Sequence, residues 1–156
     1  NNIMLYSRLS NILMWNVKLV QTEILRKDTE RCNDLCKYVE GMSNDAIGLD
    51  SKKVQESKKA AKYLKWCLGE QKDRYKRFDD TAKKIEESSE PYYNEDEDEY
   101  EDNSKTKGEI FSDYKNLLDL AKEVVTAWEW VDSAAIKLRQ LVVECGPTPI
   151  PQYLLE

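Results

Sequence analysis

Four cysteines are the residues of this chain best suited to chemistry, and histidine is absent altogether. Without histidine, Ser-His-Asp and Cys-His nucleophilic sites, imidazole metal sites and imidazole pH switches are all excluded. Pairs of carboxylates could still perform acid–base catalysis, but they need a cleft, and no sequence pattern indicates one. We therefore expect a protein that is not an enzyme and that uses no cofactor or metal.

The composition indicates which elements position these cysteines. The chain has 156 residues, of which 40% are apolar and 35% charged, with only five glycines and four prolines. That length suits a single domain with a hydrophobic core, and the shortage of turn residues favours helices over strands. No apolar run is long enough to cross a bilayer, so we expect no insertion into a membrane.

The strongest helical pattern lies near the C-terminus. Apolar residues alternate there in steps of four and three, which places them on one helix face; they are Ile110, Tyr114, Leu117, Ala121, Val124, Trp128, Val131, Ala135, Leu138, Val142 and Cys145. Thr106 and Glu109 form a capping box before this run, and Gly146-Pro147 follows it. The pattern predicts a helix from about 107 to 145.

Two further segments show the same periodicity. One predicts a helix over about 52–88, which ends before Pro91, and the other a helix over about 3–39. The second breaks into two helices if Asp28 caps a new one. We therefore predict an all-α fold, an antiparallel bundle of three long helices (four if the first breaks near residue 28) over 1–145, with a Pro-rich tail at 146–156.

The four cysteines lie at depths along the predicted bundle that match in pairs. Cys32 and Cys36 are one turn apart and point in parallel, so each should reach another helix rather than its neighbour. In an up-down-up bundle Cys36 and Cys145 lie near the same pole, and Cys32 and Cys67 lie one level deeper. We predict disulfides Cys36–Cys145 and Cys32–Cys67, and therefore a secreted protein. Four reduced core thiols are the alternative, and a zinc site lacks a C-x-x-C pair.

The charge is segregated along the chain. Eight of the thirteen residues from Glu90 to Asp102 are acidic, whereas the segment from Lys52 to Lys84 carries a net charge of +7. A run of like charges repels itself, so we expect a disordered acidic loop at about 89–106. Its tyrosines are typical of sulfation sites, and the loop is a candidate for docking onto a basic protein surface. The candidate residues are Tyr92, Tyr93, Glu95, Asp96, Glu97, Asp98, Glu99 and Tyr100. The alternative is a solvated linker without a role.

The basic segment offers a second candidate surface. Lys58, Lys62 and Lys65 recur at helical spacing. Tyr63, Trp66 and Trp130 lie off the apolar seams, and Trp66 and Tyr63, beside the lysines, are the best candidates for an interface anchor. Such a stripe suits an acidic protein or a glycosaminoglycan, and the alternative is an ordinary solvent-exposed helix face. Nucleic acid is not expected, because the whole chain is acidic and no nucleic-acid motif is present.

The cysteine arrangement, the helical pattern and the acidic stretch with tyrosines together resemble small disulfide-stapled helical salivary proteins of blood-feeding mosquitoes, among them complement inhibitors and a neutrophil-stimulating factor. The resemblance covers the general layout and transfers no functional residue. It implies a secreted protein that acts on the immune or haemostatic proteins of a host.

We therefore expect a secreted, non-enzymatic effector that binds an extracellular protein and modulates immunity or haemostasis. Two alternatives stay open. One is an intracellular helical adaptor that keeps its cysteines reduced and associates with itself through its heptad seams. The other is a carrier for a small hydrophobic ligand held between the helices.

Overall fold

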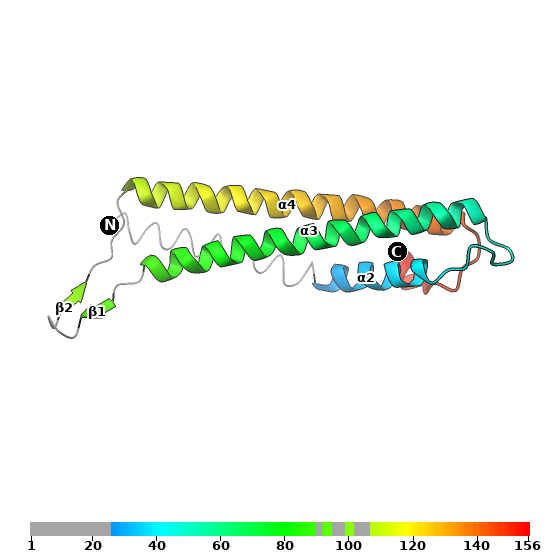
Figure 1. The fold of residues 1–156 in the computed structure, drawn as a ribbon, viewed down its shortest axis with the longest axis horizontal. Helices are drawn as coiled ribbons and strands as arrows, with labels where there is room; N and C mark the ends of the chain where they lie inside the picture. Colours follow the sequence, from blue (N-terminus) through cyan, green and yellow to red (C-terminus); the bar gives the residue numbers. More distant parts are fainter. Residues whose placement is uncertain (1–25, 90–91, 95–98, 102–106) are drawn as a thin grey trace. The chain divides into compact units, whose positions relative to one another are not determined.

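The computed structural model describes residues 26–89, 92–94, 99–101 and 107–156 (Figure 1). Its described helices are α2 (Arg26–Glu40), α3 (Ser51–Ser89), α4 (Lys107–Glu144) and α5 (Gln152–Leu155). Two short strands, β1 (Tyr92–Asn94) and β2 (Glu99–Glu101), lie between α3 and α4 in sequence. The all-α class is confirmed, and α3 and α4 match the predicted helices closely at both ends. The helix predicted from residue 3 falls largely outside the described residues, as does Thr106 of the predicted capping box.

The described chain divides into two compact units. One contains residues 26–73 and 125–156, and we call it the cysteine unit because it holds all four cysteines. The other contains the described residues between 74 and 124, and we call it the hairpin unit after its paired strands. Each of the long helices α3 and α4 contributes one part to each unit. None of the described helices is both long enough and apolar enough to span a membrane.

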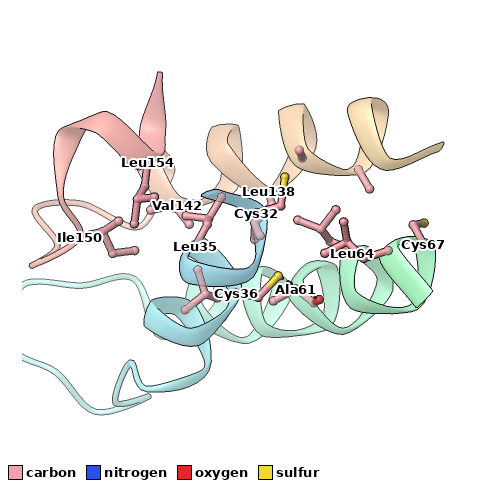
Figure 2. Packing of buried hydrophobic residues seen from close by; sticks show 14 of the residues in the cluster. Cys32, Leu35, Cys36, Ala61, Leu64, Cys67, Leu138, Val142, Ile150 and Leu154 are labelled. Carbon is pink, nitrogen blue, oxygen red and sulfur yellow. Dashed lines mark hydrogen bonds between the residues drawn. The ribbon is translucent and has the colours of Figure 1, made fainter. Parts of the chain in front are cut away.

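The core of the cysteine unit forms where α2 lies antiparallel to α3 and both pack against the end of α4 (Figures 1 and 2). Leu35 of α2, Leu64 of α3 and Leu138 of α4 are fully buried within it. All four cysteines belong to the same cluster of buried residues. The heptad pattern accounts for this burial, because it turns one apolar stripe of each helix toward the others.

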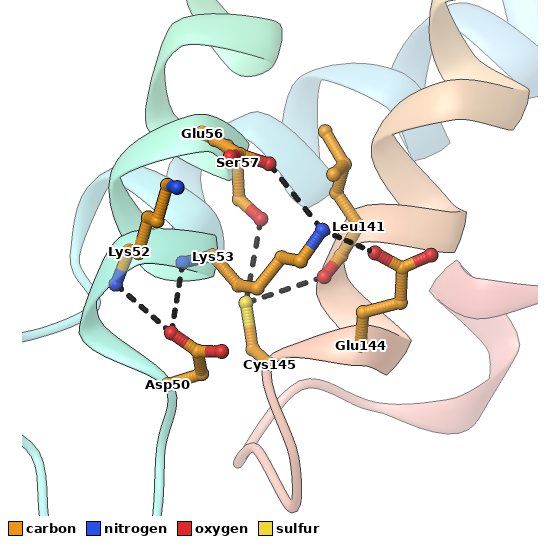
Figure 3. Close-up of polar contacts among 8 residues, drawn as sticks. All are labelled: Asp50, Lys52, Lys53, Glu56, Ser57, Leu141, Glu144 and Cys145. Atoms are coloured by element: carbon orange, nitrogen blue, oxygen red, sulfur yellow. Dashed lines mark hydrogen bonds and ion pairs between the residues drawn. The ribbon is translucent and has the colours of Figure 1, made fainter.

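Close backbone contacts join the loop after α2 to the end of α4. The Asp50 carboxylate caps α3 by accepting hydrogen bonds from the backbone N–H groups of Lys52 (3.1 Å) and Lys53 (3.3 Å) (Figure 3). The Asp50 N–H donates to the Cys145 carbonyl at 3.0 Å. Gly146 follows with φ of +109°, and a Cβ there would lie 2.9 Å from the Gly48 carbonyl oxygen. Glycine therefore ends α4, as the sequence predicts, and also permits close backbone contact.

The C-terminal tail folds back onto the cysteine unit. Ile150 and Leu154 are buried in its core, and α5 packs against α2. Arg31 donates to the Tyr153 carbonyl at 2.6 Å, and Arg139 donates to the Leu154 carbonyl at 2.9 Å. The prolines of the tail favour an extended conformation. In the structure the residues after Pro151 instead form the short helix α5, and the two arginine side chains stabilise its C-terminal end by these hydrogen bonds.

The hairpin unit has a smaller described core. Phe78, Ala82 and Ile85 of α3 pack with three residues of α4, namely Leu117, Ala121 and Val124. Arg74 also donates a hydrogen bond to the Glu123 carbonyl at 3.2 Å. Strands β1 and β2 pair antiparallel within the segment predicted to be a disordered loop, with Tyr93 opposite Tyr100. The charge pattern gives no hint of this pairing, although tyrosine itself favours strands.

Candidate functional site

An aromatic stack bridges α3 and α4 on the surface of the cysteine unit. Trp66 stacks on Tyr63 with ring centroids 6.0 Å apart, and on Trp130 of α4 with centroids again 6.0 Å apart. The ring planes meet at 22° and 20°. Tyr63 is 53% exposed and Trp66 is 52% exposed, so about half of each side chain remains open to solvent. The structure thus brings the predicted anchor, Trp66, together with two other aromatic residues.

A groove of about 470 Å³ runs between α3 and α4 beside this stack. Tyr63 belongs to both the stack and the groove. Residues spaced by helical turns on the two facing helices form its lining, which comprises Glu56, Lys59, Ala60, Tyr63, Ser133, Ala134, Lys137 and Leu141. Because Ala60 and Ala134 have small side chains, they leave a hollow where larger residues would fill the space between the helices. We call this feature the α3–α4 groove.

The predicted lysines lie apart from this groove. Lys65 forms an ion pair with Glu40 of α2 at 2.7 Å, so its side of α3 faces α2. Tyr63 lies on the side of α3 that faces α4. Lys62 is exposed and Lys58 is half-buried, but neither lines the groove. The structure therefore pairs Lys65 with α2 and leaves all three predicted lysines outside the groove.

The cysteines are free thiols, and neither predicted disulfide is formed. Cys36 donates to the Ala61 carbonyl of α3 at 3.5 Å, rather than pairing with Cys145, which directly follows α4. Cys145 lies 3.4 Å from the Ser57 hydroxyl and donates to the Leu141 carbonyl at 3.2 Å (Figure 3). Both thiols therefore contact α3, Cys36 at Ala61 and Cys145 one turn away at Ser57, rather than each other.

The other predicted pair is separated in a similar way. Cys32 lines a cavity of about 180 Å³ together with Asp132 and Arg139 of α4, so it faces α4 and not α3. Cys67, its predicted partner, lies farther along α3 beside Leu64 (Figure 2). Cys32 and Cys36 thus contact different neighbouring helices although they lie one turn apart on α2, and depth along the bundle alone does not predict this.

Burial makes the thiols poor nucleophiles. Desolvation raises the pKa of Cys36 to about 12, with smaller contributions from Cys32 and Glu40. Desolvation also raises the pKa of Cys32, although the nearby Arg139 opposes it. The pKa of Cys67 is raised by burial as well, against a hydrogen bond with Tyr63 that lowers it. A thiol must ionise to attack an electrophile or to bind a metal, so these three are kept in their inert form.

Two other predicted features remain, the absence of a metal site and the acidic segment. The described residues contain no cluster of three or more side chains suited to holding a metal ion. In the acidic segment, Tyr92, Tyr93, Glu99 and Tyr100 lie on the paired strands. The candidate residues Glu95, Asp96, Glu97 and Asp98 lie outside the described residues.

Sequence reasoning did not identify most of the groove. Lys59, Ala60 and Lys137 were not singled out, nor were Ala134 and Leu141. The available signal was the position of Tyr63, Trp66 and Trp130 off the apolar seams, which places large rings at the edge of the core. The groove itself depends on which two helices meet there, and a single helix pattern does not specify that.

The described part of the chain therefore offers an aromatic surface with an adjoining groove. Comparison of the chain with protein-family models, curated proteins and solved structures finds no match.

Proposed function

We propose that this protein is a non-enzymatic binding module whose partner is another protein, and that the partner contacts the Tyr63–Trp66–Trp130 stack. The observation that carries this proposal is the half exposure of Tyr63 and Trp66 in an ordered stack. Tryptophan and tyrosine are enriched among the residues that dominate protein interfaces, because they bury a large area and lose little conformational freedom.

The stack is also held in place before any partner arrives. Its rings come from α3 and α4, and the core residues Leu64, Ala134 and Leu138 fix those helices against each other. A rigid aromatic surface loses less entropy on binding than one carried on a loop. Protein binding therefore fits this surface better than a role confined to packing.

Carriage of a small hydrophobic ligand fits less well. Sites for small ligands usually enclose most of the ligand surface, and they are lined mainly by apolar groups. The α3–α4 groove is open to solvent, and three charged residues, Glu56, Lys59 and Lys137, contribute to its lining. An open groove of this kind suits a side chain or helix of a partner that covers it from outside.

A photo-crosslinking experiment tests the proposal. A photoreactive phenylalanine derivative placed at Trp66 should crosslink to a defined protein in extracellular fluid from the native source. The same group at Tyr38, an exposed aromatic position on α2, should not capture that protein. Addition of excess unlabelled protein should abolish the crosslink, whereas excess Trp66→Ala variant should not. Equal capture from positions 66 and 38 would refute a role for the stack.

We further propose that the protein acts outside the cell. The features that support this are the acidic tyrosine segment and the presence of four cysteines in one core. Cys36 and Cys145 contact Ala61 and Ser57, which are one turn apart on α3. Modulation of host immunity or haemostasis is the activity that the resemblance to the mosquito proteins implies.

One observation favours a second candidate, an intracellular helical adaptor. The four cysteines are free and buried, as expected of reduced core thiols. A non-reducing peptide map of protein from its native source separates the two. Disulfide-linked peptides would support the extracellular proposal, and the same spectra would reveal sulfated tyrosines. Four free thiols would instead place the binding module inside the cell.

A further inference from the structure

We propose that the α3–α4 groove binds an acidic segment of the partner protein, which places an apolar side chain over Ala60 and Ala134 and its carboxylates beside Lys59 and Lys137. This inference rests on the proposed function and names the chemistry of the partner. It concerns the groove rather than the stack, so the two can be tested apart.

The shape of the groove sets the first requirement. Ala60 of α3 and Ala134 of α4 form an apolar floor, with Leu141 and the ring of Tyr63 also lining the hollow. Because these residues recur at helical spacing on two antiparallel helices, the hollow follows the helices. An elongated apolar hollow accommodates the side chains of an extended or helical segment.

The charges set the second requirement. Glu56 shares Lys53 with Glu144, and Lys53 lies closer to Glu144 (3.0 Å) than to Glu56 (3.5 Å), so the charge of Glu56 is only partly compensated (Figure 3). Lys59 and Lys137 are exposed and form no ion pair with any residue that the structure describes. The groove therefore presents two positive charges without an ion-pair partner among the described residues, and one partly compensated carboxylate, beside an apolar floor. Carboxylates of a partner would complement them and would set its orientation.

The same features distinguish a protein segment from a sulfated polysaccharide. A polysaccharide has no apolar side chain to place over Ala60 and Ala134, and it would bind an extended array of lysines. The lysines of the predicted stripe, Lys58, Lys62 and Lys65, do not line the groove, and Lys65 is paired with Glu40. An acidic segment with apolar anchors uses both the floor and the charges of the groove.

A synthetic peptide provides the probe. It is an amphipathic helix with leucines at positions i, i+3, i+4 and i+7 and with glutamates beside them, and in the control peptide glutamines replace the glutamates. Binding of each fluorescently labelled peptide to the full chain is measured by anisotropy. We expect the acidic peptide to bind, its affinity to fall as salt is raised, and the glutamine peptide to bind at least about tenfold more weakly.

Two variants locate the binding. The double variant Lys59→Glu with Lys137→Glu should lower the affinity for the acidic peptide by about tenfold or more, because two attractions between charges become repulsions. The matched control, Lys84→Glu with Lys115→Glu, makes the same change in net charge at exposed lysines of the hairpin unit and should leave the affinity unchanged. Ala60→Leu places a larger side chain in the groove and should lower the affinity for both peptides. Circular dichroism verifies that this variant remains folded.

Several results would overturn the inference. One is an affinity for the acidic peptide that neither the lysine double variant nor Ala60→Leu changes. Another is a heparin oligosaccharide that binds in dependence on Lys59 and Lys137 but not on Ala60. A third is an oligomer of the unmodified protein that Lys59→Glu with Lys137→Glu converts to monomer, since the occupant would then be a second copy. If the native partner depends on Trp66 but not on the groove, the proposed function stands and only this inference fails.

Discussion

The two units of this protein differ in how their described cores are built. Eighteen buried residues form the cluster of the cysteine unit, contributed by α2, α3, α4, the tail and the loop after α2. Among the residues that the structure describes, six buried ones form the cluster of the hairpin unit, and these six come from α3 and α4. In the cysteine unit the same two helices also pack against α2 and the tail.

This contrast indicates where a rigid surface can form. In the cysteine unit α2 and α5 add further packing around α3 and α4, and the aromatic stack lies on this well-supported part. Buried apolar area is the main source of stability, so we expect the larger of the two described clusters to resist local opening more strongly. Substitutions and pH changes that act on one unit at a time can measure this contrast.

Two fully buried leucines of α4 provide the most direct test. Leu138 lies in the cysteine unit and Leu117 in the hairpin unit. We expect Leu138→Ala to lower the free energy of unfolding by about 3–5 kcal/mol and Leu117→Ala by about 2–3 kcal/mol, because a cavity in the smaller cluster collapses more easily. Urea denaturation measures both values. Equal losses would mean that the two cores are equally well packed.

Alkaline pH should weaken the cysteine unit selectively. The pKa of Cys36 is raised by desolvation from an ordinary value of 9.0 to about 12. Below pH 9 the thiol is protonated in both the folded and the unfolded states, so it adds no pH dependence. Between pH 9 and 12 only the unfolded state loses the proton, and stability therefore falls as pH rises.

The control for this prediction is Cys36→Ala, measured by urea denaturation across the same pH range. The variant should lose part of the pH dependence seen in the unmodified protein. An unchanged slope would show that the Cys36 thiol ionises as readily in the folded state as in the unfolded chain.

The junction at the end of α4 predicts a smaller effect. Gly146→Ala should cost about 1–3 kcal/mol, since its positive φ disfavours any side chain and the new Cβ would meet the Gly48 carbonyl oxygen. Gly48→Ala shares a positive φ but has no atom within 4 Å of the new Cβ, so it should cost only about 1 kcal/mol. Thermal unfolding compares the two, and equal costs would argue against the close contact.

The smallest effect concerns a buried polar residue of α3. Gln71 is 5% exposed, and its Nε2 atom has no hydrogen-bond partner among the described residues. Gln71→Leu should stabilise the protein by about 1 kcal/mol, because it removes an unsatisfied buried group. The exposed Gln55→Leu serves as the control and should change little. A loss of stability in Gln71→Leu would indicate that the amide is satisfied.

The long helices follow from local features of the sequence. Regular apolar spacing predicts α3 and α4 to within a residue or so at each end, and Gly146 marks the end of α4. The reason is that a helix turns every 3.6 residues and a repeating apolar stripe selects that period over others. The off-seam positions of Trp66, Tyr63 and Trp130 likewise indicate, from spacing alone, that these rings lie at the edge of the core.

What those helices bring together depends on tertiary packing. The stacking of Trp66 on Trp130, the α3–α4 groove and the direction of each thiol depend on the rotation and axial shift of one helix against another. Cys36 and Cys145 are at matching depths by sequence, yet each contacts a residue of α3 rather than the other thiol. Periodicity defines which face of a helix is apolar, but complementary packing of side chains from separate helices sets which residues meet, and that information is not contained in any one segment.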